Sequence, residues 1–173
     1  MPWSHVATMK HLRFLPLSLA LVVTLLPALR AENEAVARPA PAWTLKDVDG
    51  RTVRSDEFRG KVVVLDFWAT WCGPCRSEIP GYVELQRKYG GDGLVIVGVS
   101  FDRGGPGVVK QFIADQKVNY WIVMGDDQVA DAFGGVEAIP TTFIIDRNGV
   151  IRYRKVGAKP ADEFEAVVRP ILK

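Results

Sequence analysis

The sequence predicts an α/β protein with a mixed central sheet, helices on both faces of the sheet and a β-hairpin near the start of the folded region. Two continuous apolar stretches rich in β-branched residues, 62–65 and 94–99, are typical of strands that are covered on both faces. Helical patterns follow these stretches, and an alternation of strands and helices indicates parallel strands. Asn148-Gly149 lies between two further apolar runs and predicts a hairpin, which adds antiparallel strands to the sheet.

The N-terminal residues 1–31 have the layout of a secretory signal peptide. A weakly basic stretch precedes an apolar run at 14–29, and polar residues follow it. This run is shorter than the roughly 20 apolar residues of a membrane-spanning helix and contains prolines. We therefore expect cleavage after Ala31 or Ala37, with an uncleaved membrane anchor as the alternative. No cysteine directly follows the run, which excludes attachment through a lipidated N-terminal cysteine.

Residues 32–41 are rich in alanine, proline and charge and predict a linker, so we expect one folded domain over 42–173. Cleavage after Ala31 would leave 19 of the 22 basic residues beside all 20 acidic ones, a balance that gives no support for nucleic-acid binding. Both histidines, His5 and His11, precede the domain. Their position excludes histidine-based nucleophilic catalysis and histidine-containing zinc or copper sites in the domain.

The first half of the domain follows from local signals. Asp49-Gly50 is a two-residue turn signal, Pro80 predicts a kink in a helical pattern, and Gly90-Gly91 predicts the end of that helix. In chain order we expect hairpin strands at 43–45 and 51–53, a brief helix capped by Ser55, a strand at 62–65, a helix from Cys72 to about Tyr89, and a strand at 94–99.

In the second half, Pro106 can open a helix whose buried face would hold Val109, Phe112 and Ile113. We then expect a short strand at 120–123, a short helix at 128–133, hairpin strands at 142–145 and 150–153, and a last helix at about 161–168. Positive charge gathers near this hairpin, and we expect it to protect an edge strand from unwanted pairing, with a site for an acidic partner as the alternative. The residues concerned are Arg147, Arg152, Arg154, Lys155 and Lys159.

The only two cysteines, Cys72 and Cys75, lie where the first apolar strand gives way to a helix. Thiols three positions apart in the first helical turn share a face and can form a disulfide that opens and closes. The helix N-terminus favours the thiolate, which is the attacking species in disulfide exchange. The alternatives are a structural disulfide, which would constrain so short a loop very little, or half of a zinc site, which would need about four ligands. We expect no metal and no diffusible cofactor.

The segment 64–75, with the sequence VLDFWATWCGPC, resembles the active-site segment of the thioredoxin superfamily. Ile139-Pro140-Thr141 resembles the cis-proline loop of the same superfamily. The N-terminal hairpin, the phrase FWATWC and the insert between Gly104 and Phe133 are more similar to one branch, the exported TlpA/ResA-like thiol-disulfide oxidoreductases. The resemblance covers nearly all of 43–172 and implies a thioredoxin-like fold.

This resemblance implies roles for the residues of the motif. Cys72 would be the exposed attacking thiol, and Cys75, one turn deeper, would resolve the mixed disulfide with a client. Gly73 and Pro74 would tune the stability of the reduced form, and Pro74 also suits the first turn of a helix. Trp71 is expected to shield Cys72 and to contact substrate, with core burial as the alternative.

Two carboxyl groups are candidates for acid-base work. Asp66 lies in an otherwise apolar strand, where an unpaired charge is unfavourable, and the family places a buried acid or amide here. We expect Asp66 to help move a proton from Cys75, with a pKa raised by desolvation. Glu78 follows Cys75 by three positions and matches a glutamate of the TlpA/ResA-like branch. The alternatives are a carboxylate bound to backbone N–H groups for Asp66 and a solvated helix residue for Glu78.

Pro140 is expected in the cis form, although only about one X-Pro bond in twenty is cis. A cis peptide would leave the backbone groups of Ile139 free to pair with an extended substrate segment. Trp68 is expected to pack beneath the site.

The predicted function is an exported thiol-disulfide oxidoreductase that reduces disulfides of client proteins in the periplasm or another extracytoplasmic compartment. The resemblance implies re-reduction by a membrane electron donor and clients of the cytochrome c maturation or copper-site assembly type. We expect a monomer that binds no nucleic acid. One alternative is a peroxidase of the peroxiredoxin type, although those enzymes place a threonine three residues before the attacking cysteine. Another is a non-catalytic partner-binding or copper-carrying domain.

Overall fold

The computed structural model describes residues 33–34 and 37–173. The strands are β1 (Asn33–Glu34), β2 (Arg38–Pro39), β3 (Thr44–Asp47), β4 (Thr52–Arg54), β5 (Val62–Trp68), β6 (Leu94–Ser100), β7 (Trp121–Met124), β8 (Thr141–Ile145) and β9 (Val150–Val156). The helices are the 3-10 helix η1 (Ser55–Phe58) and the α-helices α1 (Gly73–Tyr89), α2 (Pro106–Asp115), α3 (Asp127–Ala132) and α4 (Ala161–Leu172). The predicted signal peptide lies outside the described residues. Within the described ranges, no helix is long and apolar enough to cross a membrane.

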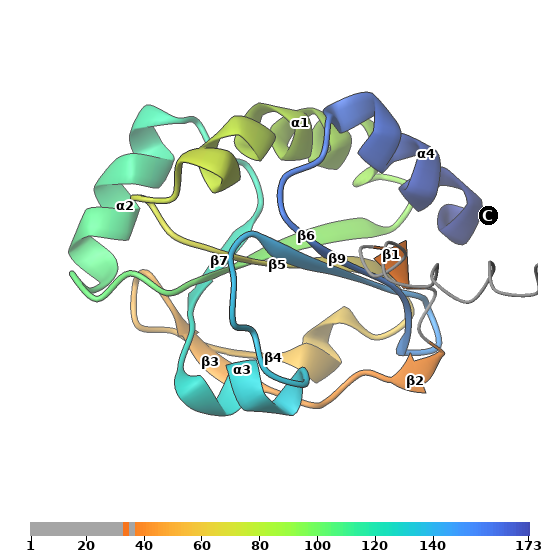
Figure 1. The fold of residues 1–173 in the computed structure, drawn as a ribbon, viewed down its shortest axis with the longest axis horizontal. Helices are drawn as coiled ribbons and strands as arrows, with labels where there is room; N and C mark the ends of the chain where they lie inside the picture. The colour runs from red at the N-terminus through yellow and green to blue at the C-terminus, as the bar shows by residue number, and fades with distance from the viewer. Residues whose placement is uncertain (1–32, 35–36) are drawn as a thin grey trace, which may run out of the picture. The chain divides into compact units, whose positions relative to one another are not determined.

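The strands form one mixed sheet in the order β1-β9-β8-β5-β6-β7-β3-β4, and β2 also pairs with β9. β5 runs parallel to β6 and antiparallel to β8, and every residue of β5 is buried. Helices α1, α2 and α4 lie on one face of the sheet, whereas α3 lies on the other together with η1 (Figure 1). This arrangement confirms the predicted fold class, because both faces of the apolar central strands are covered.

Each face of the sheet has its own apolar packing. On the α1 and α4 face, alternate residues of β5 such as Val62 and Val64 pack with Tyr82 and Phe164. On the opposite face, the residues between them pack with the hairpin of β3 and β4 and with α3, through Phe67 among others. The strict alternation of β5 therefore decides that Asp66, two positions after Val64, points toward α1.

Helix α1 begins directly after Cys72, which is its N-cap residue, and contains Pro80, as the sequence predicts. Helix α4 extends to Leu172, farther than predicted, because Ile171 and Leu172 pack against the core on the α1 side. In α2 only Val109 is fully buried, while Phe112 and Ile113 are half-buried.

The segment 32–41, expected to be a linker, is attached to the sheet at two places. Asn33–Glu34 and Arg38–Pro39 both pair with β9 in the antiparallel sense. The outer edge of β9 is therefore paired with residues of the N-terminal segment. The expectation that the positive charges of β9 protect a free edge is wrong. The local composition of this segment gave no sign of the pairing, because the pairing depends on β9, which is more than a hundred residues away.

Candidate active site

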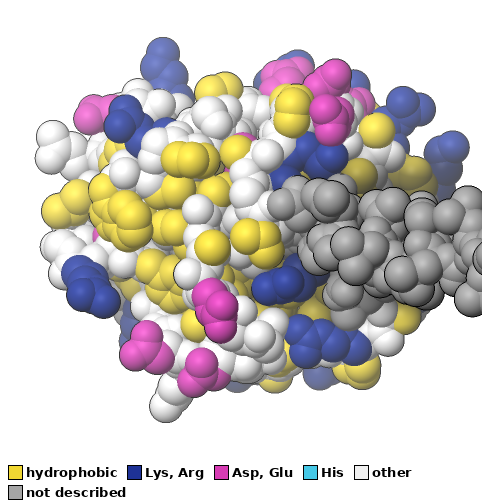
Figure 2. Space-filling view, viewed as in Figure 1, with side chains coloured by type: hydrophobic (Ala, Val, Ile, Leu, Met, Phe, Trp, Pro, Cys, Tyr) yellow, Lys and Arg dark blue, Asp and Glu magenta, His cyan; other side chains and the backbone are white. Residues whose placement is uncertain are grey.

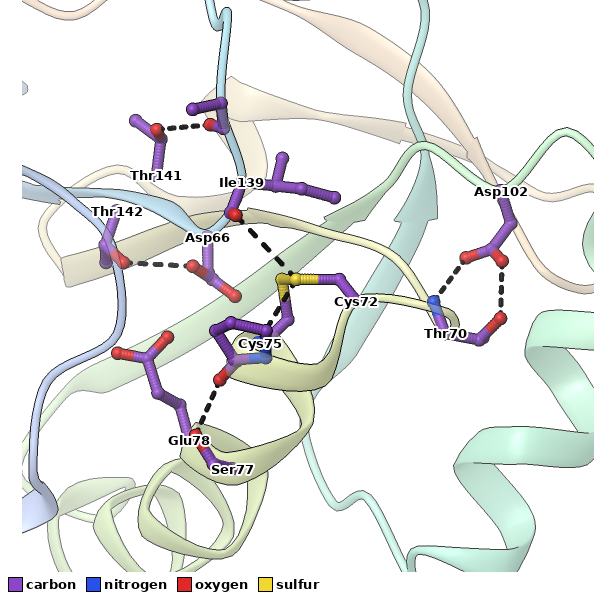
Figure 3. The surroundings of a disulfide bond; sticks show 12 residues. Asp66, Thr70, Cys72, Cys75, Ser77, Glu78, Asp102, Ile139, Thr141 and Thr142 are labelled. Atoms are coloured by element: carbon purple, nitrogen blue, oxygen red, sulfur yellow. Dashed lines mark hydrogen bonds between the residues drawn. A yellow bond between two sulfur atoms is a disulfide. The ribbon is translucent and has the colours of Figure 1, made fainter.

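Cys72 and Cys75 are joined by a disulfide at the N-terminus of α1 (Figure 3). The backbone N–H of Cys75 donates to Cys72 Sγ over 3.2 Å, so the first sulfur takes the place of an N-cap oxygen. A sulfur that accepts a helix N–H lies where the positive end of the helix dipole favours a thiolate. The position of Cys72 at the N-terminus of α1 therefore favours a thiolate there, as the spacing of the two cysteines predicts.

The expectation that Cys72 is exposed is wrong for the disulfide form, because the residue is only 5% exposed, against 2% for Cys75. The loop before β8 covers it, and the carbonyl oxygen of Ile139 lies 3.7 Å from Cys72 Sγ. Trp71 is 69% exposed and is a candidate contact for a client. The order of depth is nonetheless as expected, with Cys75 the deeper of the two.

The Ile139–Pro140 peptide bond is cis, as the sequence predicts. Pro140 is buried, whereas Ile139 is half-buried and faces the disulfide. The hydroxyl of Thr141 donates to the Ala138 carbonyl over 2.7 Å and closes the turn (Figure 3). The substrate-binding role expected for this loop stays a prediction.

The two residues between the cysteines, Gly73 and Pro74, are both exposed. Pro74 occupies the first turn of α1, and its carbonyl accepts a hydrogen bond from the Ser77 hydroxyl over 2.7 Å. A Cβ on Gly73 would meet nothing within 4 Å. Their influence on the stability of the dithiol therefore stays a prediction that packing alone does not test.

Asp102 anchors the loop before the cysteines, and sequence reasoning missed it. Its carboxylate accepts hydrogen bonds from the Thr70 N–H at 2.9 Å, from the Thr70 hydroxyl at 2.5 Å and from the Ser100 hydroxyl at 2.8 Å. Trp68 and Ser100 pair at the ends of the parallel strands β5 and β6. The carboxyl ends of parallel strands meet at one edge of a sheet, so an acidic residue just after β6 was a usable signal.

Asp66 is buried, and its carboxylate accepts a hydrogen bond from the Thr142 hydroxyl over 2.9 Å. The Tyr82 hydroxyl lies 3.2 Å from the same Thr142 oxygen. Burial raises the pKa of Asp66 well above its usual value, and the nearby Glu78 carboxylate raises it further. In Figure 3 one Asp66 oxygen points to Thr142 and the other to the side of the site where Cys75 lies. The predicted raised pKa is thus present, and proton transfer with Cys75 stays a prediction.

Glu78 is buried, so the alternative of a solvated helix residue is wrong. One carboxylate oxygen accepts from Lys155 Nζ at 3.1 Å and from the Lys159 N–H at 2.7 Å. The other oxygen, Oε2, is buried without a hydrogen-bond partner among the described residues. Burial raises the pKa of Glu78, and the Lys159 N–H and the Lys155 ammonium partly oppose that shift.

Lys155 is the second site residue that sequence reasoning missed. The residue is buried, with an exposed fraction of 5%, although the sequence groups it with the positive charges near the last hairpin. The alternation of β9 could have revealed it: Arg152 and Arg154 share one face of that strand, so Lys155 must share the other with the apolar Tyr153.

Trp68 is buried, as predicted, and packs against Phe112. The centroids of the two rings lie 5.5 Å apart. Its indole N–H has no hydrogen-bond partner among residues 37–173 and lies beside Gly98 of β6. Trp68 belongs to the same apolar cluster as both cysteines. It therefore forms part of the support beneath the disulfide.

A groove of about 940 Å³ lies beside the disulfide, and Trp71 and Ile139 are among the residues that line it. The acidic side chains of Asp126, Asp127 and Glu137 also line it, as does Val108 of α2. Figure 2 shows hydrophobic side chains gathered across this view of the molecule, with acidic ones below them, in the region of α3. An extended segment of a client could lie in such a groove with its disulfide next to Cys72.

The part of the chain that the structure describes holds no group of three or more histidine, cysteine, aspartate or glutamate residues placed to bind a metal ion. The described site brings together a disulfide, a helix N-terminus, the buried carboxyl groups of Asp66, Glu78 and Asp102, and the buried ammonium group of Lys155.

Comparisons with known proteins agree with this geometry. The model of the AhpC/TSA family matches residues 36–154. The thiol-disulfide oxidoreductase ResA of Geobacillus thermodenitrificans (strain NG80-2) is 38% identical over 133 residues, which cover 76% of this chain and 75% of ResA. The thioredoxin-like protein YneN of Bacillus subtilis (strain 168) is 36% identical over 128 residues, covering 73% of this chain and 74% of YneN.

A solved structure agrees as well. The thiol:disulfide interchange protein of the thioredoxin family from Chlorobium tepidum TLS is 33% identical, with a TM-score of 0.73, over 81% of this chain and 99% of that one. The fold, the position of the disulfide and these relatives lead to one conclusion. The chain belongs to the AhpC/TSA family and, within it, to the ResA-like branch of thiol-disulfide oxidoreductases.

Proposed function

We propose that this protein reduces disulfides of client proteins outside the cytoplasm, with Cys72 as the attacking thiol and Cys75 as the resolving one. The observation that carries the proposal is the Cys72–Cys75 disulfide at the N-terminus of α1, with the buried carboxyl group of Asp66 on the side of Cys75. The reduced protein attacks a client disulfide through Cys72, and Cys75 then releases the reduced client. Pairing of the client backbone with Ile139 and contact with Trp71 would hold the client in place.

The cellular setting is part of the same proposal. The predicted signal peptide supports the periplasm or another extracytoplasmic compartment, with or without a membrane anchor. Reduction of clients leaves the protein oxidised, so the dithiol has to be re-reduced, and the family resemblance supports a membrane electron donor for this step. The family resemblance supports clients of the cytochrome c maturation or copper-site assembly type, and a monomer is expected.

The test is to trap clients through Cys72. Cys75→Ser removes the resolving thiol, so mixed disulfides with clients should accumulate and disappear on treatment with dithiothreitol. Cys72→Ser is the matched control, because it keeps one thiol but removes the attacking one. Equal trapping by the two variants, or none by Cys75→Ser, would contradict the proposal and favour a non-catalytic binding domain.

The direction of electron flow has its own measurement, equilibration of the dithiol with glutathione. A potential of about −270 mV would support a reductant, and one of about −120 mV would indicate an oxidant.

A peroxidase is the weaker candidate. Peroxiredoxins resemble this chain in fold but place a threonine three residues before the attacking cysteine, where this chain has Ala69 before Cys72. The nearest threonine is Thr70, and both its hydroxyl and its N–H donate hydrogen bonds to the Asp102 carboxylate. Turnover of peroxide without an added thiol partner would support the peroxidase.

A further inference from the structure

A row of polar residues crosses the apolar sheet on the face that α1 covers. Asp66 of β5 pairs in register with Thr142 of β8, and Thr142 pairs with Lys155 of β9. Residues directly opposite one another in neighbouring strands project to the same face of a sheet. All three side chains are buried. The row therefore forms one polar line beneath α1.

Helix α1 completes this line with Glu78 and Tyr82, one turn apart. Glu78 pairs with Lys155, and the Tyr82 hydroxyl reaches Thr142, which donates to Asp66. The two carboxyl groups thus lie in one buried region, Asp66 on the sheet and Glu78 on α1, and Figure 3 shows both side chains directed toward it. Oε2 of Glu78, which has no hydrogen-bond partner among the described residues, is buried there.

Among the described residues, few other ionisable groups act on the two carboxyl groups. Tyr120, which precedes β7, interacts electrostatically with both carboxyl groups, and burial raises its pKa and that of Tyr82. Both tyrosines are therefore neutral at physiological pH. Lys159 contributes its backbone N–H to Glu78, while its side chain pairs with Glu163 at 2.8 Å. Lys155 is consequently the one cation of this group whose charged end meets the carboxyl pair.

The charges of Asp66, Glu78 and Lys155 can be counted for each protonation state. With one proton on the two carboxyl groups, the three side chains together are neutral. With no proton they carry a single negative charge, and without Lys155 they would carry two. Buried charge without a partner is strongly unfavourable, so a cation here decides whether both carboxyl groups can ionise near neutral pH.

We infer that Lys155 is a positioning residue of the dithiol reaction, which pairs with Glu78 and thereby allows Asp66 to accept the proton of Cys75. The inference rests on the proposed function and adds a residue to it. Lys155 touches neither sulfur nor client, and it acts through the two carboxyl groups.

The step that Lys155 supports is the resolution of the mixed disulfide. The Cys75 thiol passes its proton to the Asp66 carboxylate, and the resulting thiolate attacks Cys72 Sγ. The bond between Cys72 and the client sulfur breaks, and that sulfur leaves as a thiolate with the electron pair. The Cys72–Cys75 bond forms, so the dithiol is oxidised and the client disulfide is reduced. The proton then resides on Asp66, and the three charged side chains are neutral as a group.

The experiment follows the two thiols with the aromatic disulfide DTNB over a range of pH. Cys72 releases the first aromatic thiolate by attack, and Cys75 releases the second by resolution within the protein. The rate of the second release reports proton loss from Cys75. On a plot against pH, this rate should rise along a limb whose midpoint is set by the pKa of Asp66.

Lys155→Met and Glu78→Gln should move this limb in opposite directions. Lys155→Met removes a cation while Glu78 keeps the Lys159 N–H and remains the first carboxyl group to ionise. The limb should therefore move up by about one pH unit or more, with a second release about tenfold slower at neutral pH. Glu78→Gln removes the negative charge next to Asp66, which acts on Asp66 more strongly than Lys155 does, so the limb should move down. Damage to packing alone would not produce shifts of opposite sign.

Arg154→Met is the matched control. Arg154 is the neighbour of Lys155 on β9, but its guanidinium lies over the Phe143 ring, at 5.8 Å from the centroid. This variant removes the same charge from the other face of the sheet and should leave the limb in place.

Each outcome decides a different claim. An unmoved limb in Lys155→Met, or a shift that Arg154→Met shares, overturns the inference while the proposed function stands. Absence of a second release in the unmodified protein overturns the proposed function itself. If near-UV circular dichroism shows that Lys155→Met is unfolded, Glu78→Gln decides alone, and an unmoved or raised limb overturns the inference.

Discussion

The carboxyl group of Asp66 is the residue-scale feature with the clearest physical consequence. It lies in a strand whose residues are all buried, it accepts a hydrogen bond from the Thr142 hydroxyl, and another carboxyl group is its electrostatic neighbour. Such an environment favours the protonated form over the carboxylate. The folded protein therefore binds this proton more tightly than the unfolded chain does.

The oxidised Asp66→Asn variant should be increasingly more stable than the unmodified protein as pH rises, because only the unmodified protein loses stability with pH at this position. A raised folded pKa stabilises the folded state fully below the unfolded pKa, about 3.9, and this contribution is lost as pH rises through the folded pKa. The amide has no proton to lose and still accepts from Thr142. The free energy of unfolding of Asp66→Asn should exceed that of the unmodified protein by about 1.4 kcal/mol more for each pH unit between the two pKa values.

Urea unfolding of the oxidised proteins at a series of pH values measures this difference. Asp115→Asn, at the exposed end of α2, is the control and should follow the unmodified protein throughout. If the difference in the free energy of unfolding between Asp66→Asn and the unmodified protein did not change with pH, the pKa of Asp66 would not be raised in the folded state.

Single residues also show how far the sequence could predict the site. Cys72, Cys75, Asp66 and Pro140 were identifiable because each departs from its local pattern or belongs to a recognisable motif. Lys155 was not identified, because its role depends on the register of β9 against β8 and on the packing of α1 above both strands. The alternation of β9 can indicate that Lys155 is buried, but no stretch of sequence near it shows that it pairs with Glu78.

At the scale of elements, strands and helices follow from signals that lie within a few residues. The apolar run of β5, the glycines after α1 and Asn148-Gly149 in the last hairpin all act locally, so the predicted elements agree with the structure. Pairing with distant chain was harder to predict, as the short strands β1 and β2 show. A strand of two residues is too short to show an alternating pattern in the sequence.

The contact between β5 and β6 under the disulfide gives a prediction at this scale. Gly98 of β6 lies opposite Asp66, and a Cβ on it would lie 2.8 Å from Trp68 Nε1 and 2.7 Å from Ile122 Cδ1. Gly98→Ala should lower the free energy of unfolding by about 1–3 kcal/mol, because the added methyl group would clash with two buried side chains. Urea unfolding followed by tryptophan fluorescence measures the loss.

Gly107→Ala is the matched control for this substitution. Gly107 lies in the first turn of α2, where a Cβ would meet nothing within 4 Å. Alanine is also favoured over glycine in a helix by up to about 1 kcal/mol. This variant should be as stable as the unmodified protein or slightly more stable. Equal stability of Gly98→Ala would show that Trp68 can shift without loss.

At the scale of the whole molecule, the chain before the first hairpin completes the sheet. β1 and β2 pair with β9, and the Ala40 N–H donates to the Gly149 carbonyl over 2.8 Å. The Arg38 guanidinium donates to the Phe133 carbonyl over 2.8 Å and so connects this segment to the end of α3. The N-terminal segment therefore contacts both the edge of the sheet and the layer below it.

A chain that begins at Ala42 should be less stable than one that begins at Ala31, and it should self-associate. Each lost hydrogen bond contributes about 0.5–1.5 kcal/mol, and the bared edge of β9 offers unpaired N–H and C=O groups to a second copy. Urea unfolding and sedimentation over a range of concentrations test the two effects. Arg38→Ala in the longer chain is the control that removes only the side-chain contact, so it should lose part of the stability and stay monomeric. If the two chains had the same stability and sedimentation, β1 and β2 would contribute nothing to the fold, and the charges of β9 would suffice to protect its edge.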